Sequence, residues 1–338
     1  MWKNISSAAL SHRIFGGSAR HEIPNPKSQI PIGSWDFLGF EIWVLGFGVW
    51  GLGFEVRKLT TYLSFVRFSH SVFALPFALT GALLAWRDHP FSWSQVAWII
   101  VCMVTARSAA MGFNRLADAR HDALNPRTSM RELPRGAMTR IEATMFVVVA
   151  SALFIFAASR LNPLCFILSP VALAIVFWYS LAKRYTAYTQ FFLGLAMAVA
   201  PVGGWIAAGG GAGPEPWLLG LAIGLWVGGF DILYACQDLE FDRGHGLLSI
   251  PTRFGVRRSI LLSRVMHVAT IAAMAALWRV ADLPSLYLVG VFIVAVLLTY
   301  EQSLVSDDDL SQVKRAFDLN GYVGIVYFVA TAVSLYLR

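Results

Sequence analysis

The sequence predicts an all-α integral membrane protein, a bundle of nine transmembrane helices. Hydrophobic residues make up 57% of the 338 residues and charged residues only 14%, and the mean hydropathy is +0.60. A soluble domain carries far more charge. From residue 60 onward the chain divides into apolar spans near the length of about 20 residues that crosses a bilayer. Each span must satisfy its own backbone hydrogen bonds in lipid, so the spans are expected to be helices.

The polar interruptions between these spans set the expected helix boundaries. In chain order the nine helices are expected over residues 65–86, 95–117, 141–160, 163–182, 189–209, 217–236, 258–279, 284–303 and 317–337. Residues 59–338 are therefore interpreted as one transmembrane domain.

Residues 1–58 form an N-terminal extension of different character. Its first 34 residues are polar and contain three prolines, and the segment Trp35–Phe54 is apolar but holds five glycines, which disfavour a helix. We expect the extension to be disordered or loosely associated with the membrane. For Trp35–Phe54 three interpretations stay open: a loose extra membrane segment, an interfacial segment, or sequence that lies upstream of the natural start.

The distribution of basic residues predicts the orientation in the membrane. The net charge is +7, but Lys and Arg are scattered between apolar spans, which argues against a nucleic-acid partner. If the N-terminus is cytoplasmic, the inside loops hold thirteen Lys and Arg residues, in the ranges 120–140, 183–184, 243–258 and 314–315. The outside loops and the C-terminus hold four: Arg87, Arg160, Arg279 and Arg338. This positive-inside bias places both acidic stretches described next on the cytoplasmic side.

The first acidic stretch ends the second apolar span. Asn114, Asp118 and Asp122 recur every four residues, which stacks them on one face of a helix. Two carboxylates one turn apart suit a hard cation such as Mg²⁺, which leaves its remaining positions to water and phosphate. Arg127 and Arg131 follow, and acids beside arginines at a membrane surface indicate a bound phosphate. A polar loop with ion pairs is the alternative for this stretch alone.

The second acidic stretch ends the sixth apolar span and weakens that alternative. Asp231, Tyr234, Asp238 and Asp242 are spaced three and four residues apart, again on one helical face. Ionisable groups at membrane depth are costly and are usually functional. Two helices that each deliver a pair of carboxylates at one membrane face predict a shared site.

Together the two stretches resemble the signatures of the UbiA superfamily of membrane prenyltransferases. The first resembles Asn-x-x-x-Asp-x-x-x-Asp followed by Arg-Thr/Ser-x-x-Arg-x-x-x-x-Gly. The second resembles Tyr-Asp-x-x-Tyr-Ala-x-x-Asp-x-x-x-Asp, with Phe230 in place of the first Tyr. The resemblance covers about residues 60–338 and is greatest to the 4-hydroxybenzoate polyprenyltransferase branch and its menaquinone-pathway relatives. It implies a UbiA-like bundle whose central cavity opens at the cytoplasmic side of a bacterial inner membrane.

The resemblance also implies a reaction and roles for individual residues. A polyprenyl group would pass from its diphosphate to a small aromatic acid, either 4-hydroxybenzoate in ubiquinone synthesis or a dihydroxynaphthoate in menaquinone synthesis. The implied ligands of Mg²⁺ are Asp118, Asp122, Asp238 and Asp242. The implied catalytic residues are Arg127, Arg131 and Lys183 at the diphosphate, with Asp231 and Tyr234 at the acceptor. The implied substrate-binding residues are Arg67, Asn114, Tyr179 and Arg184.

A secondary transporter of an anionic substrate is the alternative from another class. Such proteins also have many helices and charged residues within them, but their sites lie near the bilayer midplane. The paired acids here lie at helix ends on one face, which favours the enzyme.

Overall fold

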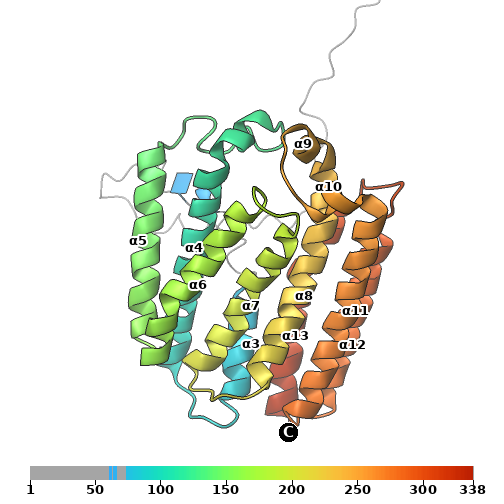
Figure 1. Cartoon of the computed structure of the whole chain (residues 1–338). Coiled ribbons are helices and arrows are strands. Elements are labelled where there is room, and N and C mark those ends of the chain that lie inside the picture. Colours follow the sequence, from blue (N-terminus) through green and yellow to red (C-terminus); the bar gives the residue numbers. More distant parts are fainter. Residues whose placement is uncertain (1–60, 63, 67–73, 338) are drawn as a thin grey trace, which may run out of the picture. The chain divides into compact units, whose positions relative to one another are not determined.

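The computed structural model describes residues 61, 62, 64–66 and 74–337, and every regular element among them is a helix (Figure 1). The N-terminal extension and its expected boundary at residue 58 lie outside the described residues. So does Arg67, which the sequence placed at the substrate.

Eight of the described helices are long and apolar enough to cross a membrane. They are α4 (Trp93–Leu124), α5 (Arg140–Ser159), α6 (Pro163–Ala182), α7 (Thr189–Ala207), α8 (Glu215–Ala235) with its continuation, α11 (Val256–Val280), α12 (Leu286–Ser303) and α13 (Val313–Tyr336). The first expected span is described as the shorter helix α3 (Leu75–Ala85), because residues 67–73 lie outside the description. Three short helical segments, η2 (Cys236–Asp238), α9 (Leu239–Gly244) and α10 (Ile250–Phe254), follow α8.

The second helix differs most from its expected bounds. It was expected to end at residue 117, but α4 continues to Leu124. The acidic motif therefore lies within the last turns of a continuous helix, not in a loop. Polarity alone marked the end too early, because the Asp118 and Asp122 side chains are buried against the rest of the protein while Arg120 of the same turns is exposed.

Local capping explains where the next two helices begin. The Thr139 hydroxyl accepts the Glu142 N–H while the Glu142 carboxylate accepts the Thr139 N–H, a capping box that starts α5. Asn162 caps α6 by accepting the Cys165 N–H at 2.8 Å, and Pro163 occupies its first position. Both helices pack against α4.

Small residues bring α3, α7 and α8 into close backbone contact. A Cβ added to Gly204 of α7 would overlap the carbonyl oxygen of Ala78 in α3, and one added to Gly194 would overlap that of Gly224 in α8. Membrane helices associate through such small residues, because lipid supplies no hydrophobic driving force between them. The packing sets α7 between α3 and α8.

Polar side chains tie the C-terminal helices to α8. The indole N–H of Trp226 donates to Asn320 of α13 at 2.6 Å, and both side chains are buried. Tyr287 of α12 and Tyr327 of α13 share a hydrogen bond of 2.8 Å. A hydrogen bond in an apolar interior is strong because no water competes for it. The first of these bonds ties α8, which carries Asp231 and Tyr234, to α13, and the second ties α12 to α13.

Candidate active site

The last turns of α4 place the first acidic motif on one buried face, as the spacing predicted. Asp118 is 4% exposed and Asp122 is 6% exposed. The Asn114 amide donates to Asp118 Oδ2 at 3.4 Å, one turn away. Buried carboxylates require compensating charge, so their partners decide what the site can bind.

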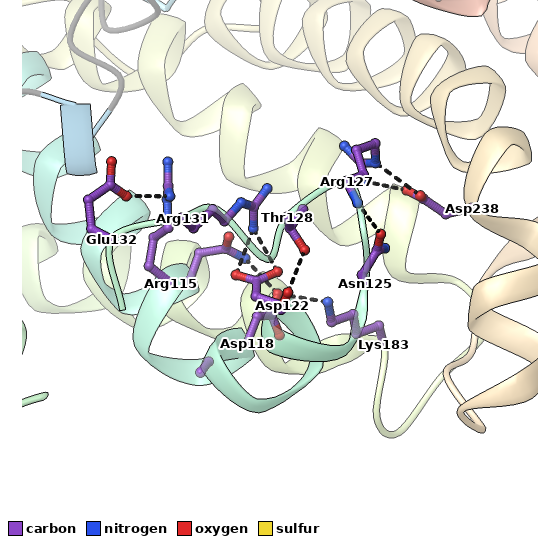
Figure 2. A network of polar contacts seen from close by, with 12 residues as sticks. Arg115, Asp118, Asp122, Asn125, Arg127, Thr128, Arg131, Glu132, Lys183 and Asp238 are labelled. Carbon is purple, nitrogen blue, oxygen red and sulfur yellow. Dashed lines mark hydrogen bonds and ion pairs between the residues drawn. The ribbon is translucent and has the colours of Figure 1, made fainter. Parts of the chain in front are cut away.

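Cations from two other segments neutralise these carboxylates (Figure 2). Lys183 Nζ lies 2.7 Å from Asp118 Oδ2, and Arg184 Nη2 lies 3.2 Å from Asp118 Oδ1. Arg131 Nη1 lies 2.9 and 2.8 Å from the two oxygens of Asp122. The helix α6 ends at Ala182, directly before Lys183, at the same end of the bundle where α4 ends. Three residues expected at the substrate therefore contact the carboxylates in this structure.

The segment after α4 is held against that helix by contacts that the sequence reasoning missed. Thr128 Oγ1 donates to the Asp122 carbonyl at 3.1 Å. Arg115 and Glu132 form a buried ion pair at 2.8 Å, and Ser64 Oγ donates to the other Glu132 oxygen at 2.8 Å. A lone Glu beside Arg131 gives no periodic signal, so spacing alone could not have found this pair.

The second acidic stretch departs from the single helical face that its spacing predicted. Helix α8 ends at Ala235, a 3₁₀ turn covers Cys236–Asp238, and α9 carries Asp242. The tighter 3₁₀ turn changes the direction in which the later side chains point. Asp231 and Tyr234 thus belong to α8, whereas Asp238 and Asp242 lie beyond the change.

Arg127 joins the two stretches across 111 residues of sequence. Its Nη2 lies 2.6 Å from Asp238 Oδ2 and its Nε lies 3.2 Å from Oδ1, a two-point ion pair. Its Nη1 also donates to the Tyr234 hydroxyl at 3.0 Å. Figure 2 shows Arg127 reaching from the loop after α4 toward Asp238. The two motifs predicted to share a site therefore do meet.

An apolar cavity of about 590 Å³ lies next to these groups. Its walls come mainly from α4, α6, α7 and α8, and their side chains are almost all apolar. Tyr179 lines the cavity one turn before Lys183, and Arg107 lines it two turns before Asn114. The charged end of the site and the apolar cavity are thus continuous along α4 and α6.

Asp231 and Asp242, the other two acids of the second stretch, are half-buried on α8 and α9.

The carboxylates do not form a closed metal cage among the described residues. No group of three or more His, Cys, Asp or Glu side chains converges closely enough to hold a metal by itself. The donor set consists of carboxylate and amide oxygens in two separate places. Such a set suits a cation that completes its coordination with ligand oxygens and water.

The family model of the UbiA prenyltransferase family matches residues 74–329, which is most of the chain. The chain belongs to the UbiA prenyltransferase family. It is 32% identical over 246 residues to a 4-hydroxybenzoate octaprenyltransferase of Vibrio parahaemolyticus. The aligned region covers 72% of this chain and 86% of that relative. It is 33% identical over 241 residues to the enzyme of the same name from Citrobacter koseri, with coverage of 70% and 83%.

Solved structures of UbiA homologues share the fold. The apo structure of a homologue from Aeropyrum pernix is 34% identical, with a TM-score of 0.73 and coverage of 78% of this chain and 98% of that chain. A homologue from Archaeoglobus fulgidus, solved bound to GPP and Mg²⁺, is 20% identical with a TM-score of 0.62, covering 81% and 99%. This UbiA family member is therefore an integral membrane prenyltransferase with an all-helical bundle, as the sequence predicted. The family assignment favours the enzyme over the transporter.

Proposed function

We propose that this UbiA family enzyme transfers a polyprenyl group from polyprenyl diphosphate to 4-hydroxybenzoate, which gives a ubiquinone precursor. The observation that carries the proposal is the joining of two carboxylate pairs and four cations at one end of an apolar cavity. A charged head and a long apolar tail match these two environments. The relatives named for 4-hydroxybenzoate favour this acceptor over a dihydroxynaphthoate.

The carboxylates fit Mg²⁺ as the cation. Asp118 and Asp122 would hold one ion with help from Asn114, and Asp238 and Asp242 would hold a second. Three of these four carboxylates already carry a Lys or Arg partner in the structure, which lowers the cost of gathering so many carboxylates in one place. Bound Mg²⁺ would supply positive charge to the diphosphate and stabilise it as a leaving group.

Arg127, Arg131, Lys183 and Arg184 would neutralise the rest of the diphosphate charge. Each now bonds a carboxylate through an N–H group that can also donate to a phosphate oxygen. From this end of the cavity, these donors would meet the negative charge that develops on the leaving group. Preformed donors need little rearrangement during the reaction.

The apolar cavity would hold the prenyl tail and exclude water. The bond from the first carbon to the diphosphate oxygen breaks, and the allylic cation left behind must not meet water. The ring carbon ortho to the acceptor hydroxyl attacks that carbon, a carbon–carbon bond forms, and the ring loses its proton. Tyr179 lines the cavity near this point.

Asp231 and Tyr234 would act at the acceptor. They lie one turn apart on α8, and Tyr234 already contacts Arg127. Asp231 would accept the ring proton or orient the acceptor, with Tyr234 holding its position. Arg107 lines the cavity two turns from Asn114, where a guanidinium suits the acceptor carboxylate.

The orientation is part of the same proposal. The excess of Lys and Arg on one face favours a site that opens to the cytoplasm. The named relatives come from bacteria, which supports a location in the bacterial inner membrane.

The test is prenyl transfer by the purified protein in detergent. Octaprenyl diphosphate, Mg²⁺ and either 4-hydroxybenzoate or a dihydroxynaphthoate are supplied, with EDTA as control. We expect product with 4-hydroxybenzoate that disappears with EDTA. Product with the naphthoate alone would overturn the acceptor, and product that survives EDTA would overturn the metal. A donor that fails to bind would overturn the reaction.

A further inference from the structure

The glycines of α7 differ in what surrounds them. Gly194 and Gly204 each face a neighbouring backbone that leaves no room for a side chain. Gly203 is different, since a Cβ added there meets no atom within 4 Å. Glycine is disfavoured inside a helix relative to alanine. Packing within the protein explains Gly194 and Gly204 but does not explain Gly203.

Gly203 borders the apolar cavity, at the end away from the acidic motifs. Gln190, near the start of α7, accepts the N–H of Ile250 on the side of the charged groups. Gly203 lies thirteen residues after Gln190, a distance of about 20 Å along the helix axis at a rise of 1.5 Å per residue. One turn after Gly203, the end of α7 meets the turn between α5 and α6. There the Asn162 amide donates to the Ile206 carbonyl at 2.8 Å. Gly203 thus lies deep in the cavity.

We propose that Gly203 determines the length of prenyl chain that the enzyme accepts. The proposal rests on the proposed function, in which the cavity holds the prenyl tail. The missing side chain leaves the space through which a long chain continues past the first isoprene units. A geranyl chain of two units stays nearer the diphosphate, whereas an octaprenyl chain of eight units must extend to this depth.

The experiment compares Gly203→Leu and Gly203→Ala with a matched control, Gly321→Leu. Gly321 is also a helical glycine, in the middle of α13, where an added Cβ meets nothing within 4 Å. It is exposed and does not border the cavity. Geranyl and octaprenyl diphosphate are titrated with Mg²⁺ and no acceptor, and donor affinity is read from the rise in melting temperature. Product with 4-hydroxybenzoate is then measured for both donors.

We expect Gly203→Leu to lower the ratio of octaprenyl to geranyl affinity at least about tenfold, because methylene-sized changes in an apolar pocket discriminate by that much. Gly203→Ala should lower the ratio less, and Gly321→Leu should leave it unchanged. If Gly203→Leu does not fold, Gly203→Ala carries the test. An unchanged ratio in a folded Gly203 variant, or an equal fall in Gly321→Leu, would overturn the proposal.

The two readouts separate this proposal from the proposed function. If the wild-type protein binds both donors but makes no product, the proposed acceptor reaction fails while the affinity ratio still tests chain length. If product forms and the ratio is unchanged, only the role of Gly203 fails. If neither donor raises the melting temperature, the cavity does not hold a prenyl chain and both proposals fall.

Discussion

The carboxylates of the first acidic motif are buried and paired with several cations, whereas the second motif is more exposed and held by fewer contacts. The Asp118 and Asp122 side chains are 5% and 9% exposed and together bind three cations. Asp238 is 20% exposed, lies at a change in helix type and pairs with Arg127 alone among the ion pairs of the described residues. The first motif belongs to one continuous helix, and the second follows the end of one.

This difference predicts different tasks for two motifs of similar spacing. Buried carboxylates with fixed partners form a preassembled site, because moving them would leave charge unpaired in an apolar interior. A partly exposed pair costs little to separate. We therefore expect ligand binding to rearrange the pair Arg127–Asp238 while the α4 site stays in place. Four substitutions test this comparison, from the largest expected effect to the smallest.

Asp118→Asn should have the largest effect on turnover. It removes a proposed metal ligand and the shared partner of Lys183 and Arg184, so we expect turnover to fall at least about 100-fold in a protein that remains folded. Initial rates at saturating Mg²⁺ measure this. The matched control is Asp318→Asn, which removes an exposed carboxylate 3.3 Å from Lys314 and should leave the rate unchanged. Wild-type turnover in Asp118→Asn would contradict the metal assignment.

Asp238→Asn should mainly raise the Mg²⁺ concentration that the enzyme needs for activity. A neutral amide binds Mg²⁺ more weakly, so we expect turnover to fall and the half-saturating Mg²⁺ concentration to rise roughly 10- to 100-fold. A Mg²⁺ titration of the initial rate measures the shift. If the Mg²⁺ dependence stays that of the wild-type enzyme, the second motif does not bind the ion.

Arg127→Gln should weaken donor binding more than it weakens the fold. Loss of charged hydrogen bonds to the diphosphate should raise the donor KM about tenfold. Loss of the half-exposed pair should change the unfolding free energy by less than about 1 kcal/mol. Steady-state kinetics and thermal unfolding separate these quantities. Arg127→Lys keeps the charge but not the two-point geometry, so a full rescue by Lys would show that geometry does not matter.

Glu132→Gln should affect stability more than catalysis. It removes the charge of Glu132 from the buried ion pair with Arg115, and we expect a loss of roughly 3 kcal/mol in unfolding free energy. The donor KM should change only a few-fold, because the ion pair between Arg131 and Asp122 does not involve Glu132 and remains. Thermal unfolding in detergent measures the loss, with the exposed Glu240→Gln as the control. A loss no larger than that of the control would show that the buried pair does not hold the loop.

Much of the fold and of the candidate site could be predicted because both depend on local patterns. Span length and hydropathy predicted the eight long helices, and four-residue spacing predicted the common face of Asn114, Asp118 and Asp122. The continuation of α4 to Leu124 and the 3₁₀ turn at Cys236 were missed. Those features depend on what packs against each segment, which spacing does not encode.

The sequence by itself determined the class of the protein, because membrane spans, charge bias and motif spacing are properties of neighbouring residues. It also predicted the carboxylates and cations to which we assign the chemistry. Only the tertiary structure decided how they pair: Lys183 with Asp118, Arg127 with Asp238, and Arg115 with Glu132. The physical reason is that ion pairs and cavities form between segments 17 to 111 residues apart. Their geometry depends on how the helices pack, and so does the space beside Gly203.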